Sequence, residues 1–584
     1  MKRLLLYFLV MLVLVAWWAT STRQEVPDFN STSPVQTGYP ADFQPRLKKL
    51  NDIHTTLNEK LPEGLCWESA QNHPVPGNPE AVKGGRIRIS NAGPYPAHFL
   101  KFGGTVQFFH QNLNTATDVP LLQLHPLTKQ ITAGVASAWA KSGNTFYLQL
   151  NREARYNNGC PVRAADYLLG LLLQAEQKCT EYEAIAALAD KISTHGDSIL
   201  SIRLKNTADI LTVCQQLTAA EPGFYSQFDS RFRQTYAQRI PPTTGAYKVK
   251  RTEKGRLIEL ERVQNWWGEK TPLGQYRFNA NTIEFHFLTS EAQVWEFFLR
   301  KKLDALQTRN IAAWQERLTD HPEVSTLTYD AEYPMPPYGI AINTRTVSNI
   351  DIRKGLLQAM DMNRAIQLIW RGEAQRLTTF SSGYGKLSPE HTPEYSYSPE
   401  KARACFFRAG YSVQGSDGIL RKADGTKLSV KLLYTPNEKI STLISSLISS
   451  AATCGAEIIP EAVPWQTCQR QLDERKHELV FWAVPAPATP QPELFFAKTA
   501  ESSFSPFSLD SQEMEQALDE YKKQPTADNL AHIDKLVYQS AIWLQGWKEN
   551  RVYLAHHSHI QIPISPWCYD ALDAHMFWVL PSTP

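Results

Sequence analysis

The stretch formed by residues 135–172 constrains the fold most, because three elements follow one another there with almost no spare residues. Apolar side chains alternate with their neighbours over residues 146–150, which predicts a strand with one buried face. Residues 157–159, Asn-Asn-Gly, are typical of a turn, since both residue types tolerate positive φ. Pro161 excludes a continuing central strand, and an apolar stripe predicts a helix from near Arg163. This order of elements indicates an α/β fragment.

The composition is that of a globular protein with several modules. A chain of 584 residues is too long for one hydrophobic core, and at about 150 residues per domain it suggests roughly four modules. Hydrophobic residues make up 42% and charged residues 20%, and 60 basic against 58 acidic residues leave a formal net charge of +2. This balance provides no basic surface, so we expect no nucleic-acid partner.

The N-terminus has the features of an export signal. Lys2 and Arg3 precede an apolar run over residues 4–19, which has the charged and hydrophobic regions of a secretory signal. A membrane span needs about 20 apolar residues, so this run is borderline short. We expect residues 1–21 to be a signal peptide or an anchor, and residues 22–61 to be a linker or N-terminal extension.

The sequence lacks the common catalytic motifs. It contains no Gly-x-Ser-x-Gly, no Gly-x-x-x-x-Gly-Lys-Ser/Thr and no His-Glu-x-x-His, so we predict neither enzymatic activity nor a cofactor. His557 and His559 would share one face of a strand, which suits zinc or nickel. No carboxylate or cysteine lies within a few residues of them, so we predict no metal site. The eight cysteines show no Cys-x-x-Cys spacing, and pairing of Cys454 with Cys468 stays open.

Ten residues of the opening stretch fall on a family pattern: Ala136, Ser137, Trp139, Ala154, Tyr156, Gly159, Pro161, Val162, Ala164 and Asp166. The stretch resembles the family 5 extracellular solute-binding proteins, the peptide- and nickel-binding receptors of bacterial ABC importers. Asn158 stands where that family usually has Asp, and Arg163 stands where it usually has a Thr that could cap the helix.

Further blocks resemble the same family in the same order, over about residues 62–584. They are the first strand at 83–89, the segment Pro-Thr-Thr-Gly-Ala-Tyr at 242–247, the strand and helices at 338–370, and the capped helix at 398–410. We interpret residues 242–247 as strand-building rather than ligand-contacting. Residues 62–68 and 124–126 resemble the branch associated with uptake of microcin-type peptide conjugates.

The resemblance implies an α/β fold of the two-lobed periplasmic binding protein type II, with a hinge and with lobes built from discontinuous segments. On this basis we expect lobe 1 to comprise residues 62–110, 196–285 and 541–584, with a subdomain at 111–195. Lobe 2 would comprise residues 286–540.

The resemblance also implies the function. The protein would capture a peptide or peptide-like solute between two closing lobes and deliver it to the transmembrane subunits of an ABC permease. We expect a monomer in the periplasm, anchored to the inner membrane if the N-terminal helix is uncleaved. No Cys precedes Cys66, so the lipid-modified Cys that tethers many such receptors in Gram-positive cells is missing. The alternative is a membrane-anchored sensory or scaffold protein with a degenerate binding-protein fold.

Five residues are expected to bind the ligand. Phe481 and Trp482 resemble the family's strand that ends in Trp at the mouth of the pocket, while core packing is the alternative role for Trp482. Trp465, Tyr384 and Asn112 fall near segments that face the cleft in the family. Many peptide receptors hold the α-ammonium of the peptide with an Asp shortly after that Trp, but this chain has Val-Pro-Ala-Pro at 484–487.

Overall fold

The structure is a computed structural model, and the chain folds into two compact units. Unit 1 comprises Met1–Thr328 and Tyr553–Pro584, and unit 2 comprises Tyr329–Val552. The structure describes residues 23–25 and 38–580, apart from gaps at 70–73, 92–93, 104–107, 126–129, 206–209, 228, 273, 309–310, 331–335, 371–373, 375, 385–386, 390–391, 485–489, 499–504, 549–550 and 563–576. The expected export signal at 1–21 lies outside the described residues. No helix in the described ranges is long and apolar enough to cross a membrane.

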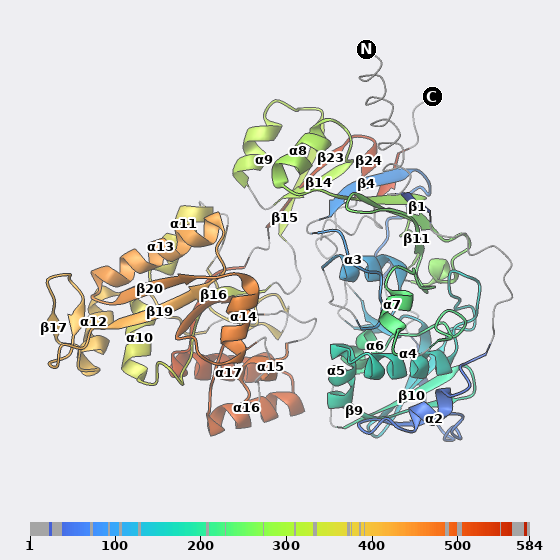
Figure 1. Cartoon of the computed structure of the whole chain (residues 1–584), viewed down its shortest axis with the longest axis horizontal. Helices are drawn as coiled ribbons and strands as arrows, with labels where there is room; N and C mark the ends of the chain where they lie inside the picture. Colours follow the sequence, from blue (N-terminus) through green and yellow to red (C-terminus); the bar gives the residue numbers. More distant parts are fainter. Residues whose placement is uncertain are drawn as a thin grey trace, which may run out of the picture. The chain divides into compact units, whose positions relative to one another are not determined.

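Unit 1 is built on two larger sheets and one smaller sheet (Figure 1). The first sheet has the order β1 (Arg23–Glu25), β11 (Tyr247–Glu253), β12 (Leu257–Arg262), β13 (Thr282–Phe287) and β4 (Arg86–Asn91). The second has the order β2 (His54–Thr56), β9 (Ala189–His195), β10 (Ile199–Leu204), β8 (Thr145–Leu150), β7 (Ala136–Ser142) and β3 (Trp67–Glu68). The third has the order β14 (Ala305–Thr308), β23 (Arg551–His557) and β15 (Val324–Asp330).

The other elements of unit 1 are helices and two short strand pairs. They are α2 (Phe43–Leu47), α3 (Phe108–Thr117), β5 (Leu122–Leu124) with β6 (Ile131–Ala133), α4 (Ala164–Glu176), α5 (Thr180–Leu188), α6 (Ile210–Gln216), α7 (Phe232–Tyr236), η1 (Trp267–Lys270), α8 (Glu291–Leu299), α9 (Ile311–Leu318) and β24 (Ile560–Gln561) with β25 (Trp578–Val579). α4 packs against β9 and β10, and its apolar face lies in the largest core of the unit.

The predicted strand, turn and helix are confirmed as β8, the Gly159 turn and α4. Arg163 occupies the N-cap without a capping side chain of its own. Asp166 compensates, because its carboxylate accepts a hydrogen bond from the Arg163 backbone N–H at 2.9 Å. The same carboxylate accepts from the phenol of Tyr39 at 2.6 Å and from that of Tyr156 at 3.0 Å. Asp166 therefore joins the helix start to the turn and to the N-terminal segment.

The folded part begins earlier than the sequence indicated. Within residues 22–61, expected to be a linker or extension, α2 buries Phe43 and Leu47, and Ile53 is also buried. β2 then pairs in parallel with β9 at the edge of the second sheet. The short α2 has only a few apolar residues between polar ones, which is why composition suggested a linker.

Unit 2 is built on a five-stranded sheet with helices on both faces. Its order is β20 (Glu457–Ala462), β19 (Ser429–Tyr434), β21 (Leu479–Ala483), β16 (Tyr338–Ile342) and β22 (Trp543–Gln545). The remaining elements are α10 (Ile350–Ala359), α11 (Met362–Trp370), α12 (Pro399–Arg408), β17 (Val413–Gln414) with β18 (Leu420–Arg421), α13 (Glu438–Thr453), α14 (Trp465–Asp473), α15 (Glu493–Phe496), α16 (Gln512–Lys523) and α17 (Ala527–Ser540). Two hydrophobic cores cover the sheet, one containing α10, α11, α12 and α13 and the other containing α14, α16 and α17.

The units divide the chain at different positions from the expected lobes. Residues 286–328 belong to unit 1 rather than starting a second lobe, and residues 541–552 belong to unit 2. Strand pairing explains the difference, because β14 pairs with β23 and β22 pairs with β16. The buried Asp304 also accepts hydrogen bonds from the backbone and side chain of Arg88 on β4, at 2.5–3.1 Å. These pairings are long-range, and no local pattern encodes them.

A buried carboxyl in unit 2 predicts a pH-dependent stability. Asp534 on α17 accepts from the Thr379 hydroxyl at 2.5 Å and the Phe380 N–H at 3.3 Å, and burial raises its pKa to about 7. A raised pKa gives stability that is present below the unfolded pKa of about 4 and is lost as the pH rises to about 7. From pH 5 to pH 8, we expect wild type to lose on the order of 2–3 kcal/mol of unfolding free energy relative to Asp534→Asn. Urea titrations of both proteins at the two pH values test this. An equal change in unfolding free energy between pH 5 and pH 8 in both proteins would contradict it.

Candidate functional site

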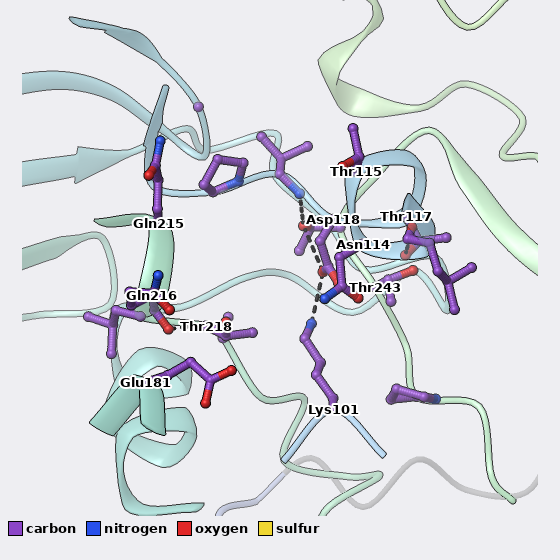
Figure 2. A pocket seen from close by; sticks show the side chains of 18 of the residues that line it. Lys101, Asn114, Thr115, Thr117, Asp118, Glu181, Gln215, Gln216, Thr218 and Thr243 are labelled. Carbon is purple, nitrogen blue, oxygen red and sulfur yellow. Dashed lines mark hydrogen bonds and ion pairs between the residues drawn. The ribbon is translucent and has the colours of Figure 1, made fainter. Parts of the chain in front are cut away.

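A cavity of about 790 Å³ lies within unit 1. Its walls come from the end of α3, the end of α4, the start of α5, the end of α6 and the loop at 240–244. Figure 2 shows Gln215, Gln216 and Thr218 on one side and Asn114 and Thr115 on the other. Ligand pockets typically measure about 300–1,000 Å³. The cavity is therefore large enough for a small organic solute.

Close backbone approach at Gly245 fixes the wall near α3. A Cβ at Gly245 would lie 2.4 Å from the Thr117 carbonyl carbon, so no other residue fits there without a shift. The Gly245 N–H donates to the Thr117 carbonyl at 2.7 Å, and the Val119 N–H donates to the Thr244 hydroxyl at 3.0 Å. The Pro-Thr-Thr-Gly segment thus holds the end of α3 in place. The structure also puts Thr243 and Thr244 on the cavity wall, where sequence reasoning gave this segment a strand-building role.

Two tryptophans support the same loop. The indole N–H groups of Trp266 and Trp267 both donate to the Thr244 carbonyl, at 2.8 and 2.9 Å. Both residues also line the cavity. Their polar atoms are therefore used within the protein, and a solute would meet mainly the ring surfaces.

An ion pair lies in the cavity wall. The Lys101 ammonium and the Asp118 carboxylate are 2.8 Å apart, and their side chains are 8% and 19% exposed (Figure 2). The Thr244 hydroxyl lies 3.5 Å from the same carboxylate oxygen. A charge at such a buried position needs a partner, because its desolvation is expensive. The two groups neutralise each other, so this part of the wall offers a solute no net charge.

Uncharged polar side chains make up much of the remaining wall. The carboxamides on it are Asn114, Gln123, Gln174, Gln177, Gln215 and Gln216, and several threonines add hydroxyl groups. A carboxamide both donates and accepts hydrogen bonds, as does a hydroxyl. Such a lining matches a solute whose own groups also donate and accept, such as an amide or an alcohol.

The thiol in the wall is unreactive. Cys179 is buried and accepts a hydrogen bond from the Gly103 N–H at 3.1 Å, and burial raises its pKa to about 11. The thiolate is the nucleophilic form of cysteine, so at neutral pH this group is a poor nucleophile. Cys179 therefore contributes buried surface to the wall rather than a reactive thiolate.

The structure brings two of the predicted ligand residues together in unit 2. Trp465, the first residue of α14, stacks on Trp482 of β21 with ring centroids 4.9 Å apart and an angle of 9° between the planes. Trp482 is buried, whereas Trp465 is 49% exposed. The pair therefore presents the Trp465 ring to solvent. Trp482 also packs in the hydrophobic core of unit 2.

The other predicted residues lie elsewhere. Phe481 packs on the opposite side of the sheet, because successive side chains of a strand point to opposite faces. There it stacks with Tyr338 and Trp547, at 5.9 Å from each ring. Tyr384 lies near Tyr521 in unit 2, and burial raises its pKa. Asn112 is on α3, two residues before Asn114 of the cavity wall, and its side chain lies outside the described residues.

The histidine segment at 556–559 takes part in packing. The ring of His557 stacks on Phe298 at 4.5 Å, and its Nε2 lies 2.9 Å from the Phe298 carbonyl oxygen. His559 Nε2 lies 3.1 Å from the Asp304 carboxylate, an acid 255 residues away in the sequence. Across the described parts of the chain, no group of three or more His, Cys, Asp or Glu side chains is arranged to hold a metal ion.

Solved structures share the fold. The oligopeptide-binding protein AppA from Bacillus subtilis, solved with a nonapeptide, has a TM-score of 0.69 at 13% identity and covers 86% of this chain and 100% of its own. NikA from Brucella suis, solved with Fe(III)-EDTA, has a TM-score of 0.67 at 16% identity and covers 82% of this chain and 97% of its own. The predicted fold class, a two-lobed α/β periplasmic binding protein of type II, is therefore confirmed.

Sequence comparison gives the family. The "Probable peptide-binding protein YejA" of Agrobacterium fabrum is 22% identical over 328 residues, which are 52% of each chain. The chain spans about half the length of the curated relatives it matches. The assignment to a microcin-type branch stays a prediction. Residues 130–505, more than half of the chain, match the model "Bacterial extracellular solute-binding proteins, family 5 Middle", and the chain therefore belongs to the family 5 bacterial extracellular solute-binding proteins.

Proposed function

We propose that this protein is the solute-binding component of an ABC importer and that its solute is a peptide or a peptide-like molecule. The observation that carries the proposal is the cavity of unit 1, with its carboxamide and hydroxyl lining and its neutralised ion pair. Peptide amides donate and accept in alternation, so such a wall can satisfy them without a counter-charge. The nonapeptide of AppA and the described role of YejA favour the same solute class.

The proposal also gives Trp465 and Trp482 of unit 2 a role in binding. The exposed ring of Trp465, backed by Trp482, is a rigid apolar surface of the kind that binding sites use for side chains or rings of a solute. Capture by closure of two lobes, delivery to a permease, a monomeric state and location in the periplasm are part of the same proposal. Family membership and the apolar N-terminal run at 4–19 support this part of the proposal.

The test is ligand-dependent thermal stability of the exported chain. A ligand that binds only the folded state at 100 times its Kd adds about 2.7 kcal/mol, which for a protein of this size raises the Tm by roughly 2–4 °C. We expect this shift with a random pool of short peptides, and no shift with mannohexaose or with nickel alone. A shift with the sugar or the metal but not with peptides would contradict a peptide-like solute.

A further inference from the structure

Part of the wall of the unit 1 cavity is aromatic, and hydrogen bonds within the protein hold its rings in place. Trp266 and Trp267 both line the cavity, and the side chain of each is partly exposed. Both indole N–H groups donate to the Thr244 carbonyl, so the one polar atom of each side chain is satisfied. The ring surface that remains accessible is therefore apolar and available to a solute.

Packing makes this aromatic wall rigid. The two indole rings lie 5.7 Å apart, and Trp267 also packs against the largest hydrophobic core of the unit. The ring of Phe278 meets Trp266 edge-on at 5.0 Å. The backbone at Gly268 also approaches Trp266 closely, since a Cβ there would lie 2.3 Å from the indole ring. Rings that are held before binding lose little conformational entropy when a solute packs on them.

The charges of the cavity favour an uncharged ring over a cation at this wall. Indole rings attract cations in general. The Arg277 guanidinium, however, already lies over the Phe278 ring, 5.0 Å from its centroid. Apart from the Lys101–Asp118 ion pair, the described lining holds three basic side chains and one acidic side chain, which are Lys178, Arg233, Arg277 and Glu181. A solute cation would meet this excess of positive charge, whereas a neutral aromatic ring would not.

Resting on the proposed function, we propose that the cavity of unit 1 selects peptide-like solutes that carry an uncharged aromatic ring, and that this ring packs against Trp266 and Trp267. The two tryptophans are then specificity-determining residues. The carboxamide and hydroxyl groups elsewhere in the lining are left for the amide groups of the solute.

The test compares three tetrapeptide pools that differ at one position, which holds phenylalanine, cyclohexylalanine or leucine. Cyclohexylalanine is about as large as phenylalanine and at least as apolar but has no π system, so burial of apolar area alone would not favour phenylalanine. Calorimetric titration of the full-length chain should give a Kd about three- to tenfold lower for the phenylalanine pool than for either of the others. An equal or higher Kd for the phenylalanine pool would overturn the inference and leave the proposed function standing. Absence of binding by all three pools would contradict the proposed function as well.

Two pairs of variants test whether the tryptophans produce this preference. Trp267→Phe and Trp267→Leu both remove the hydrogen bond to the Thr244 carbonyl, but only the first keeps an aromatic ring. Trp266→Phe and Trp266→Leu form the same pair at the neighbouring position. We expect both Phe variants to keep the preference, and at least one Leu variant to bring the Kd values of the phenylalanine and cyclohexylalanine pools to within about twofold of each other. A preference that persists in both Leu variants, or that is lost equally in the Phe and Leu variants, would overturn the role of the two rings.

Trp67→Leu is the matched control. Trp67 lies on β3 of the same unit, is 38% exposed and is not among the described lining residues of the cavity. This variant should keep the wild-type preference. Loss of the preference in Trp67→Leu would show that the discrimination arises outside the cavity wall, and would overturn the inference. Thermal unfolding without solute checks that each variant is folded, and the comparison of pools on the wild-type chain needs no variant.

Discussion

Lys101→Met is expected to destabilise unit 1 by on the order of 3 kcal/mol, because it leaves the Asp118 carboxylate in the cavity wall without its cation. The ammonium lies 2.8 Å from that carboxylate. The Thr244 hydroxyl lies 3.5 Å from it, which is too long to replace an ion pair. Urea unfolding followed by circular dichroism measures the loss. The pair is mostly buried, so salt should screen it little.

The double variant and a surface pair provide the controls. Lys101→Met combined with Asp118→Asn removes both charges, and should recover most of the stability that the single variant loses. Lys191 pairs with Glu59 at 2.7 Å, but both side chains are about a third exposed, so Lys191→Met should cost less than about 1 kcal/mol. Equal losses for Lys101→Met and Lys191→Met would contradict the buried character of the cavity pair.

Gly170→Ala is expected to destabilise the protein by on the order of 3 kcal/mol, although Gly to Ala in a helix ordinarily stabilises by about 1 kcal/mol. Gly170 lies inside α4, and a Cβ there would lie 1.7 Å from the Thr218 carbonyl oxygen. The backbone at 216–220 would have to move, and Thr218 lines the cavity. Under the proposed function, solute affinity should therefore fall together with stability.

The same urea titration measures the effect of Gly170→Ala. Gly38→Ala is the control, because a Cβ at Gly38 meets no atom within 4 Å. It should change the unfolding free energy by less than about 0.5 kcal/mol. A Gly170→Ala protein as stable as wild type would show that α4 and the 216–220 segment do not approach as closely as described.

The fold was more predictable than the site because its signals are local. Alternation at 146–150, the turn at Gly159 and the start of α4 each depend on neighbours in sequence, so each could be predicted. The Ser398 cap of α12 was predicted for the same reason, and its hydroxyl accepts from the Lys401 N–H. The division into units depends on the pairing of β14 with β23, more than 240 residues later, which no local pattern reveals.

The cavity residues carried little sequence signal. Lys101 and Asp118 lie 17 residues apart in segments without a motif, and their pairing appears only in the folded chain. Gln174 lies in a mostly apolar helix, which is typical of a core element. Its hydrogen bond to the Gln216 carbonyl forms only in the folded chain. The Thr243–Gly245 segment did carry a family signal, but the pattern cannot separate a residue that builds a wall from one that also faces the solute. The stacking of Trp465 on Trp482 likewise depends on how α14 packs against β21, which the sequence pattern does not reveal.

Hydrogen exchange of the full-length chain, with and without the peptide pool that gives the largest Tm shift, tests whether the unit 1 cavity binds the solute. We expect slower exchange on binding in the segments that form the cavity wall, at 113–119, 174–181 and 215–218. Binding that leaves exchange in these three segments unchanged would contradict the assignment of the unit 1 cavity as a solute site.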